Sequence, residues 1–390
     1  MDNHITPIGI TNWRNQNKPF GIKDADRLHH VYVIGKSGTG KSTLLINMAL
    51  SDIQKGKGLA IIDPHGDVSQ TLIKNIPEVR KNDLIYFNPA DVNTFISFNP
   101  IHGVHPNYHH LVASGLVSTF KKIWRDSWGP RLEHILRYSL LTLLCYPNAT
   151  LLDIQPLLTE TAFRDKVLDN VTNPHIITFW KNEYEAYSPK QRSEFIASIL
   201  NKMGIFRASG PLKNILGQPT KGIRMSQIMD RSKIFIANLS KGQLGEDAST
   251  ILGSMLVTSF QLNALYRATI PEYQRVPFYL YIDECHSFIT DSIADILAEA
   301  RKYKLSLFLT HQYIEQLPEP IQAAIFGNVG TVISFRVGAT DAQYLEREFY
   351  PAFDAIDLIN LPRYGILLKL CIDGQISRGF SAYTELITTK

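Results

Sequence analysis

The chain has 390 residues, of which 44% are hydrophobic, and its formal net charge is +4. This composition is ordinary for a globular protein of one or two domains, and the chain shows no internal repeat and no low-complexity linker. The three cysteines, Cys145, Cys285 and Cys371, are odd in number and far apart. They argue against a disulfide framework or a zinc ribbon, and we expect a reducing, cytoplasmic location.

The charge is unevenly distributed along the chain. Residues 102–231 contain 16 Lys and Arg against 10 Asp and Glu, a net charge of +6, whereas the rest of the chain carries −2. A basic segment on a near-neutral remainder favours a polyanionic partner such as DNA. A solvated surface would give the same imbalance, so the sign alone does not decide between the two.

Residues 31–88 alternate between strand and helix patterns. We expect strands at 31–34, 59–62 and 84–87, a helix over 41–54 and a short helix after Gly66. Such alternation predicts a parallel α/β sheet.

The first strand leads directly into Gly35-Lys36-Ser37-Gly38-Thr39-Gly40-Lys41-Ser42, which matches the phosphate-loop pattern at every fixed position. Glycines let backbone N–H groups turn toward a β-phosphate, Lys41 would reach the β- and γ-phosphates, and the Ser42 hydroxyl is placed for Mg²⁺. A plain strand–helix connection is the alternative, which the flanking strand and helix disfavour. We predict nucleotide binding by nine consecutive residues: Gly35, Lys36, Ser37, Gly38, Thr39, Gly40, Lys41, Ser42 and Thr43.

Asp63 closes the second strand, at the sheet edge where parallel α/β proteins bind ligands. It is a candidate for contacting the attacking water or the Mg²⁺ shell. The alternative is a structural turn around residues 64–66, followed by a helix cap at Asp67.

Between about residues 102 and 217 helical patterns dominate, several of them opened by a proline, as at Pro130 and Pro189. In the first of these helices the apolar residues fall on one face: Leu132, Ile135, Leu136, Leu140 and Leu143. Trp124 and Trp128 lie near Lys121, Lys122 and Arg125. They could stack on bases, but their helical spacing favours the core.

The strands return after Lys233, at 234–239, 278–282, 305–309 and 331–335, and the tail predicts a hairpin turning at Asp373-Gly374. An uncharged stretch from Ala248 to Tyr266 contains seven polar side chains, too many for a lipid-facing helix. We expect a helix buried against the sheet, and no membrane anchor in this chain.

Asp283 and Glu284 end the apolar strand at 278–282. Beside a phosphate loop, Asp283 would hold Mg²⁺ through a water molecule, and Glu284 would orient and deprotonate the attacking water. Gln312 follows the next strand and would sense the γ-phosphate, although it could instead cap a turn. Arg301 comes at the edge of the intervening helix, where a neighbouring subunit would dock. It is the first candidate for an arginine that acts on the neighbouring subunit's nucleotide, and Arg336 is the second.

With these motifs in place the chain resembles the HerA/FtsK-type branch of the RecA-like ATPases. It is most similar there to the motor of TraG/TraD-like coupling proteins of type IV secretion. The matching segments are GKSGTGKS, DPHGD, YIDE, EARKYKLSLFLTHQ and GNVGTVISFRVG, which span about residues 32–349. Two features depart from these families. Coupling proteins usually begin with membrane helices, and HerA helicases begin with a small barrel, for which the 30 residues before Val31 are too few.

The resemblance implies an α/β fold: a RecA-like, doubly wound, mainly parallel sheet with an inserted all-α domain and a C-terminal β-hairpin. We expect residues 1–101 and 218–390 to form the two parts of the ATPase domain and residues 102–217 the insertion. The family further implies ATP and Mg²⁺ as ligands, a homo-hexameric ring, DNA as the partner, and Arg301 acting on the adjacent subunit. A membrane-anchored or secretion-channel partner would recruit the ring to the inner face of the membrane.

The leading hypothesis is therefore an ATP-driven DNA translocase in conjugative transfer. The alternatives are a viral or plasmid genome-packaging ATPase and a HerA-like DNA-processing helicase. Outside enzymes, the alternative is a protein that uses ATP only as an assembly switch, which Glu284 argues against.

Overall fold

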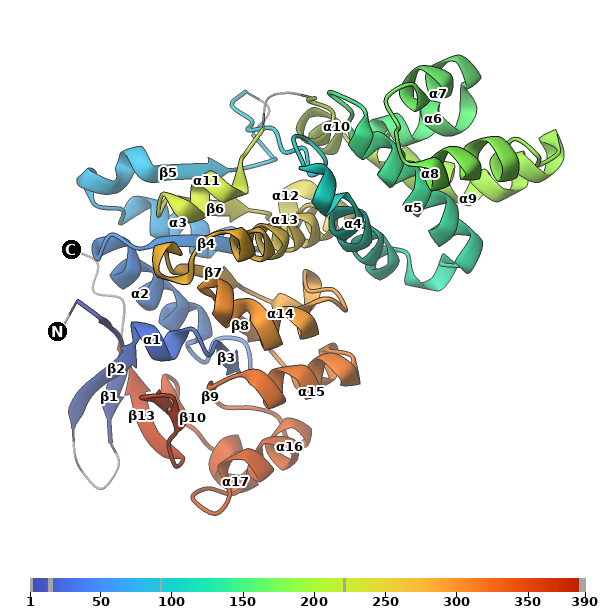
Figure 1. Ribbon diagram of the computed structural model, residues 1–390. Helices are drawn as coiled ribbons and strands as arrows, with labels where there is room; N and C mark the ends of the chain where they lie inside the picture. The colour runs from blue at the N-terminus through green and yellow to red at the C-terminus, as the bar shows by residue number, and fades with distance from the viewer. Residues whose placement is uncertain (1–2, 13–16, 92, 220–221, 386–390) are drawn as a thin grey trace. The chain divides into compact units, whose positions relative to one another are not determined.

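The structure is a computed structural model that describes residues 3–12, 17–91, 93–219 and 222–385. The chain divides into two compact units. The sheet unit comprises residues 1–87, 225–240 and 263–390, and the helical unit comprises residues 88–224 and 241–262. Figure 1 labels their elements.

The sheet unit is built on an 11-stranded sheet in the order β2-β1-β13-β10-β9-β3-β8-β7-β4-β6-β5. Its strands, with the small β11–β12 pair, are β1 (Ile5–Thr11), β2 (Lys18–Lys23), β3 (Val31–Ile34), β4 (Gly58–Asp63), β5 (Leu84–Phe87), β6 (Ile234–Asn238), β7 (Phe278–Ile282), β8 (Leu305–His311), β9 (Thr331–Ser334), β10 (Gly365–Lys369), β11 (Cys371–Ile372), β12 (Gln375–Ile376) and β13 (Phe380–Thr384).

The strands from β9 to β5 in this order pair in parallel, whereas β10, β13, β1 and β2 pair antiparallel. Every residue of β3, β4, β6, β7, β8 and β9 is buried. Such burial is expected when helices cover both faces of a parallel sheet, and it explains why continuous apolar runs mark these strands in the sequence. The predicted doubly wound, mainly parallel sheet is confirmed.

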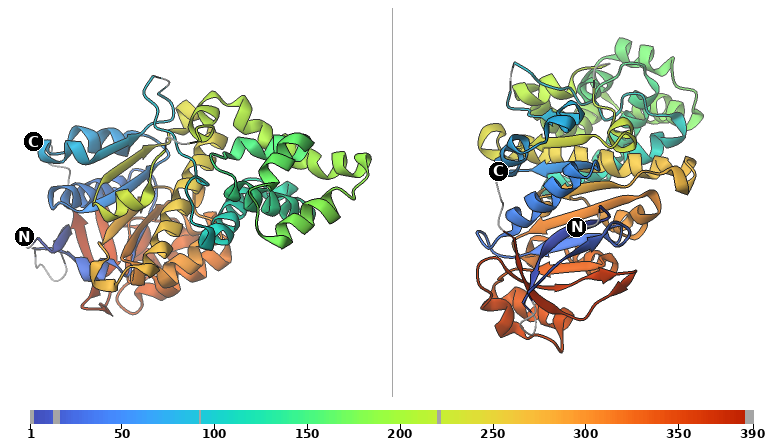
Figure 2. Two further views of the ribbon diagram at one scale, coloured as in Figure 1. Left: turned by 45° about the horizontal axis from the view of Figure 1, so that its top comes forward. Right: turned by 90° about the vertical axis from the view of Figure 1, so that its left-hand side faces the viewer.

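The helices of the sheet unit are α1 (Asp24–Arg27), α2 (Lys41–Gln54), α3 (Asp67–Lys74), α11 (Met225–Asp230), α14 (Ile293–Glu299), α15 (Glu319–Asn328), α16 (Ala339–Phe349) and α17 (Ala355–Ile359). Helix α2 packs against β1, β4 and α3, while α14 packs against α15. Figure 2 shows the sheet and its flanking helices from two further sides.

Two N-terminal strands were not predicted. Strands β1 and β2 form a hairpin that joins the sheet through β13, from the opposite end of the chain. Pro7 and Gly9 interrupt the hydrophobic alternation of β1, and the register shifts between them. The β1–β2 pairing is local, but β13 lies more than 360 residues from β1, so no local pattern could reveal that second pairing.

The C-terminal hairpin is confirmed. Strands β11 and β12 pair antiparallel, with Cys371 opposite Ile376. The turn residues Asp373 and Gly374 have φ angles of 50° and 78°. Positive φ at both central positions is the signature of a type I′ turn, which an Asp-Gly sequence favours.

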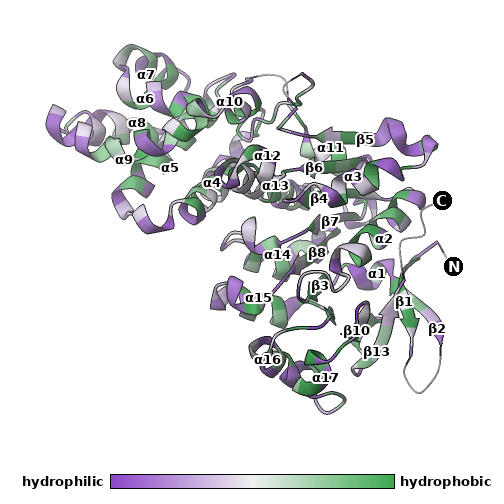
Figure 3. Ribbon diagram, turned by 180° about the vertical axis from the view of Figure 1, so that it is seen from behind, coloured by the Kyte–Doolittle hydropathy of each residue, from purple (hydrophilic) through white to green (hydrophobic). Residues whose placement is uncertain are grey.

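The helical unit contains helices in the part of the chain where the sequence predicts an all-α insertion. Its helices are α4 (His109–Ile123), α5 (Pro130–Cys145), α6 (Ile154–Thr159), α7 (Thr161–Leu168), α8 (Pro174–Thr178), a π-helical segment (Phe179–Tyr184), α9 (Pro189–Ala208), α10 (Gly210–Leu216), α12 (Lys241–Leu244) and α13 (Glu246–Tyr266, which continues into the sheet unit). The apolar face predicted for α5 is buried. Figure 3 shows hydrophobic and hydrophilic stretches alternating along α4–α9, as expected of helices packed on one another.

The compact units differ in extent from the predicted boundaries. The helical unit comprises residues 88–224 and 241–262, whereas the insertion was predicted over residues 102–217. The uncharged stretch after Ala248 does form a helix, α13. Most of that helix clusters with the helical unit, so its packing against the sheet stays a prediction. The predicted division into two parts of an ATPase domain and an inserted domain likewise stays a prediction.

Candidate nucleotide site

The phosphate loop connects β3 to α2, as predicted. Gly38 and Gly40 have φ angles of 75° and 127°, which a side chain would strain, and Gly40 is the N-cap of α2. Inside the loop, the Lys41 ammonium donates to the carbonyl oxygens of Gly35 at 2.6 Å and Lys36 at 3.2 Å. The loop therefore presents its backbone around a buried lysine.

Burial lowers the pKa of Lys41, while the facing carboxylates of Glu284 and Asp283 act in the opposite direction. The lysine thus lies in a poorly solvated position close to two acids. A cation held in this way is suited to binding an anionic group brought to the loop.

The two acids follow β7, on the same edge of the sheet. The side chain of Asp283 is almost fully buried and accepts hydrogen bonds from the Thr310 hydroxyl and from the backbone N–H of Glu284. Burial raises the pKa of Asp283 to about 6, and the nearby Glu284 and Asp63 carboxylates add to the effect. Burial therefore makes ionisation of Asp283 more costly than that of a solvated aspartate, and a bound cation would offset part of this cost.

Glu284 has a left-handed backbone, with φ 45° and ψ 54°, an uncommon conformation for a side chain of this size. One of its carboxylate oxygens accepts a hydrogen bond from the Gln312 amide at 3.0 Å, and the other lies 3.5 Å from Nδ1 of His286. His286 in turn lies within 3.4 Å of the Gln316 amide and 3.3 Å of the Ser287 hydroxyl. The carboxylate is thus held by Gln312, which follows the neighbouring strand β8.

Most of the residues predicted to bind nucleotide or take part in hydrolysis line one pocket of about 370 Å³. Its lining comprises Ser37, Gly38, Gly40, Lys41, Ser42, Thr43, His65, Asp67, Asp283, Glu284, Gln312, Arg363 and Tyr364. Gly35, Lys36 and Thr39 support the loop from outside this lining: the Thr39 hydroxyl donates to the carbonyl of Lys36 at 2.7 Å. One pocket therefore holds the phosphate loop, both acids and the glutamine.

Asp63 lies outside the lining, although it ends the neighbouring strand β4. It is fully buried, and its two carboxylate oxygens accept three backbone N–H groups, those of His65, Gly66 and Ser69, at 2.8–2.9 Å. These bonds fix the turn into α3 and leave little of the carboxylate for a ligand. The geometry favours the structural alternative for Asp63.

A scan of protein families matches residues 21–258 to the family described as the central domain of the helicase HerA. The chain belongs to this HerA family. The match covers more than half of the chain and includes the phosphate loop. A comparison with the curated proteins found no significant match.

Solved structures establish the fold of this HerA-family chain. The plasmid coupling protein TrwB in complex with ADP and Mg²⁺ has a TM-score of 0.67 and 16% identity, over 95% of this chain and 88% of that one. VirB4 of Thermoanaerobacter pseudethanolicus has a TM-score of 0.63 and 15% identity, over 100% and 98% of the two chains. With its phosphate loop and its family, the chain is a RecA-like P-loop ATPase.

The oxygen ligands that Mg²⁺ needs are present beside the loop. The Ser42 hydroxyl and the Asp283 carboxylate line the same pocket, and such oxygen donors suit a hard divalent cation. The raised pKa of Asp283 fits the same conclusion, because a bound cation would stabilise the carboxylate that burial disfavours. The residues present therefore fit Mg²⁺.

Arg301 does not join this pocket. It is exposed in a 3₁₀ turn (Ala300–Tyr303) before β8, and its guanidinium lies 3.5 Å from Nδ1 of His29. Gln312 follows the same seven-residue strand, so at about 3.3 Å per residue the two ends are more than about 20 Å apart. Arg301 therefore lies at the amino end of β8, whereas the nucleotide pocket lies at the carboxyl end of that strand. Arg336 lies nearer the pocket, and its carbonyl accepts the Lys36 N–H at 2.8 Å.

Sequence reasoning missed four residues that shape the pocket. Nδ1 of His286 lies 3.5 Å from a carboxylate oxygen of Glu284, and its place two residues after the acid was a local signal. His65 lines the pocket beside Asp67. Arg363 and Tyr364 come from the loop before β10, and only the fold brings that loop to the phosphate loop.

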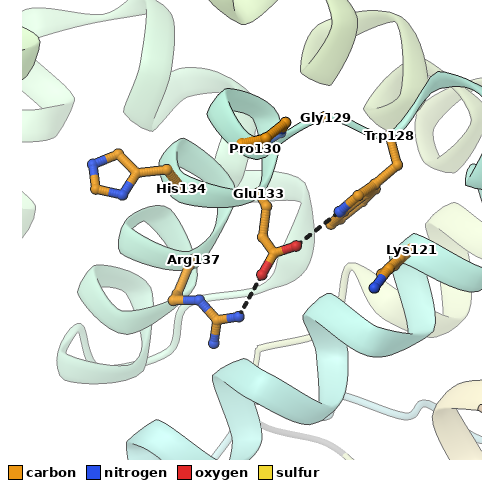
Figure 4. A pocket seen from close by; sticks show the side chains of 7 residues that line it. All are labelled: Lys121, Trp128, Gly129, Pro130, Glu133, His134 and Arg137. Atoms are coloured by element: carbon orange, nitrogen blue, oxygen red, sulfur yellow. Dashed lines mark hydrogen bonds and ion pairs between the residues drawn. The ribbon is translucent and has the colours of Figure 1, made fainter. Parts of the chain in front are cut away.

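The helical unit has a pocket of its own, of about 400 Å³, lined by Lys121, Trp128, Gly129, Pro130, Glu133, His134 and Arg137. Figure 4 shows Glu133 between Trp128 and Arg137, both of which donate to it at 2.9 Å. Trp128 is half-buried, whereas Trp124 is buried and stacks on Phe120 with ring centroids 4.8 Å apart. The core interpretation thus holds for Trp124 but not for Trp128.

Within the described ranges of the chain, no helix is both long and apolar enough to cross a membrane.

Proposed function

We propose that this chain is an ATP-hydrolysing DNA translocase that works as a hexameric ring in conjugative transfer. The fold supports the proposal, because it is shared with TrwB, described as a bacterial conjugative coupling protein, and with VirB4. The membership in the HerA helicase family supports an enzyme that handles DNA.

The contact between Glu284 and Gln312 carries the proposal. The Glu284 carboxylate follows Asp283, the proposed Mg²⁺ ligand, and accepts a hydrogen bond from a glutamine on the neighbouring strand. This supports the proposal, because such a carboxylate can orient a water for attack on a γ-phosphate. When nucleotide enters, the γ-phosphate competes for the Gln312 amide and releases Glu284 toward the water. A protein that used ATP only as a switch would not need this base.

The other pocket residues have complementary roles in the proposed reaction. Lys41 would move its ammonium from the loop carbonyls to the β- and γ-phosphates, and Ser42 and Asp283 would hold the metal. Mg²⁺ held there would help to neutralise the charge of the phosphates. Arg301 would complete that neutralisation in the adjacent subunit, since its own pocket lies at the other edge of the sheet.

We place DNA contacts on the helical unit, at Lys121, Lys122 and Arg125. Lys121 lies beside the half-buried ring of Trp128, a combination of cation and aromatic face that suits a nucleic-acid strand. Arg137 adds a second cation, partly neutralised by Glu133. The net charge of +6 over residues 102–231 provides the attraction at longer range. A secretion-channel or membrane-anchored partner would position the ring.

The deciding experiment is ATPase activity measured with no DNA, single-stranded DNA and duplex DNA, with particle images of the same samples. The proposal expects DNA-stimulated turnover and ring-shaped particles with six subunits. Absence of hydrolysis with DNA present would favour an assembly switch. Stimulation by linear ends but not by closed circles would favour genome packaging.

Charge reversal tests the DNA surface. Lys121→Glu with Arg125→Glu should weaken DNA binding far more than basal hydrolysis, and wild-type binding should fall by orders of magnitude between about 50 and 200 mM salt. Lys166→Glu on α7 is the matched control, because Lys166 is exposed on the same unit but outside the pocket. Unchanged DNA binding in the double variant would remove this surface from the proposal.

A further inference from the structure

The nucleotide pocket has two sides, which the sheet order defines. The strands that carry His65, the acids and Gln312 are β4, β7 and β8, which all lie on one side of the phosphate-loop strand β3. Strands β9 and β10 lie on its other side, and the loop before β10 supplies Arg363 and Tyr364 to the pocket. A triphosphate whose γ-phosphate faces Asp283 and Glu284 therefore extends its other end toward the β9–β10 side.

Tyr364 is fixed against the phosphate loop. Its backbone N–H donates to the carbonyl of Thr39 at 2.9 Å, and its own carbonyl accepts the N–H of Thr384 at 2.9 Å. The residue has a φ of 65°, a conformation that costs a non-glycine residue free energy and that these bonds maintain. The ring covers Gly40 so closely that a Cβ built there would lie 2.8 Å from Cδ1 of the tyrosine. Tyr364 is thus a rigid aromatic wall of the pocket.

Arg363 is exposed, and its guanidinium lies over the Tyr364 ring, 4.9 Å from the centroid. Within the described part of the chain, no ion pair engages this guanidinium. A planar guanidinium can stack on an aromatic face, including that of a nucleobase, so this arrangement offers a flat cationic and aromatic surface at the pocket rim.

We propose that Arg363 and Tyr364 form the nucleoside side of the pocket and hold a purine base by stacking. This inference rests on the nucleotide site of the proposed function and adds to it the recognition of the base. Stacking engages the face of a base and not its hydrogen-bonding edges. The enzyme should therefore accept ATP and GTP with similar affinity and bind pyrimidine triphosphates more weakly.

The test compares binding of ATP, GTP, CTP and inorganic tripolyphosphate, measured by calorimetry on the full chain. The wild type should bind ATP and GTP within about threefold of each other. Arg363→Ala and Tyr364→Leu should each raise the Kd for ATP about tenfold and leave tripolyphosphate unchanged. Tyr364→Phe should retain ATP affinity, because it keeps the ring and the loop geometry.

Two controls make the result specific. Arg378→Ala removes an exposed arginine outside the pocket and should change nothing. Lys41→Ala should weaken the binding of ATP and of tripolyphosphate together, which shows the effect of losing the phosphate site itself.

If Arg363→Ala also weakened the binding of tripolyphosphate as much as that of ATP, the arginine would serve the phosphates and the stacking proposal would fail. It would equally fail if both variants bound ATP like the wild type. Failure of DNA stimulation alone would count against the translocase and not against the nucleoside side.

Discussion

The pockets of the two units each contain a carboxylate, but in opposite electrostatic conditions. In the sheet unit, burial raises the pKa of Asp283 to about 6. In the helical unit, hydrogen bonds from Trp128 and Arg137 lower the pKa of Glu133. Asp283 is desolvated, and its hydrogen bonds do not fully offset the cost of burying its charge, which is typical of a cation-binding site. Glu133 is already satisfied by its neighbours, so it organises the surface around it. Substitutions in the first pocket should therefore alter kinetics, and those in the second should alter stability and DNA binding.

The largest effect should come from an arginine outside both pockets. Arg301→Ala should bind ATP normally and hydrolyse it about 10³–10⁵-fold more slowly, as expected when a trans-acting arginine is lost from a phosphoryl-transfer site. The defect should appear only under conditions in which rings form. Steady-state ATPase rates, with ring formation followed by particle images, measure both.

Mixing variants tests whether Arg301 acts between subunits. Arg301→Ala protein mixed with Lys41→Ala protein should recover part of the activity, because an intact phosphate loop then meets an intact arginine across an interface. Arg336→Ala is the control for an arginine near its own pocket. Mixed rings that co-assemble without recovering activity would assign the role to Arg336 or to an arginine within the same subunit.

The next effect concerns the general base of the sheet-unit pocket. Glu284→Gln keeps a hydrogen-bonding partner for Gln312 but removes the base, so hydrolysis should fall about 10²–10⁴-fold with ATP binding retained. Single-turnover hydrolysis together with a binding titration separates the two quantities. Wild-type hydrolysis by this variant would remove Glu284 from the mechanism, while Lys41→Ala should lose binding itself.

A smaller effect compares the two acids directly. Asp283→Asn removes a charge that burial penalises and should raise the free energy of unfolding in the absence of nucleotide and Mg²⁺, by about 1–3 kcal/mol. Glu133→Gln should lower it by about 1 kcal/mol, because the charge-assisted bond from Arg137 is weakened. Chemical denaturation of both variants gives the signs. If both variants changed the free energy of unfolding in the same direction, the two pockets would not differ as their pKa shifts indicate.

The features that could be predicted from the sequence are those that neighbouring residues encode. The phosphate loop, the acidic pair and the parallel strands were predicted, because each is encoded by neighbouring residues and because strands buried on both faces leave continuous apolar runs. Gln312 was predicted to sense the γ-phosphate from a neighbouring strand end, and that role stays a prediction. Its hydrogen bond to Glu284 was not predicted, although the two residues follow neighbouring parallel strands.

Other features depend on segments far apart in the chain. The pairing of β1 with β13 and the approach of Tyr364 to Gly40 join residues more than 300 positions apart, and no local pattern signals them. Trp124 and Trp128 are four residues apart with similar neighbours, yet a stacking contact on Phe120 buries only the first. Asp63 was ambiguous because a carboxylate at a strand end suits a ligand and a turn equally well, and only its three backbone bonds distinguish them.

The smallest predicted effect concerns the response of the two units to acid. In the sheet unit, burial lowers the pKa of His30 to about 4, and Nδ1 of this residue accepts the backbone N–H of Leu307 at 3.1 Å. The unfolded chain protonates its histidines near pH 6.5, so between pH 6.5 and 4 it binds more protons than the folded state, and stability is lost as the pH falls. In the helical unit, burial also lowers the pKa of His109, but this histidine is only half-buried.

Acid should therefore loosen the sheet unit first, and His30 should account for roughly 1 kcal/mol of the stability lost between pH 7 and 5.5. Hydrogen exchange at both pH values locates the loss. His30→Asn is the informative variant, because its amide oxygen can accept the Leu307 N–H, asparagine tolerates the φ of 66° at this position, and the titration is removed. The variant should show a shallower dependence of unfolding free energy on pH. A slope equal to that of the wild type would assign the acid sensitivity to another group, with the buried His311, whose pKa burial lowers to about 3, as the next to replace.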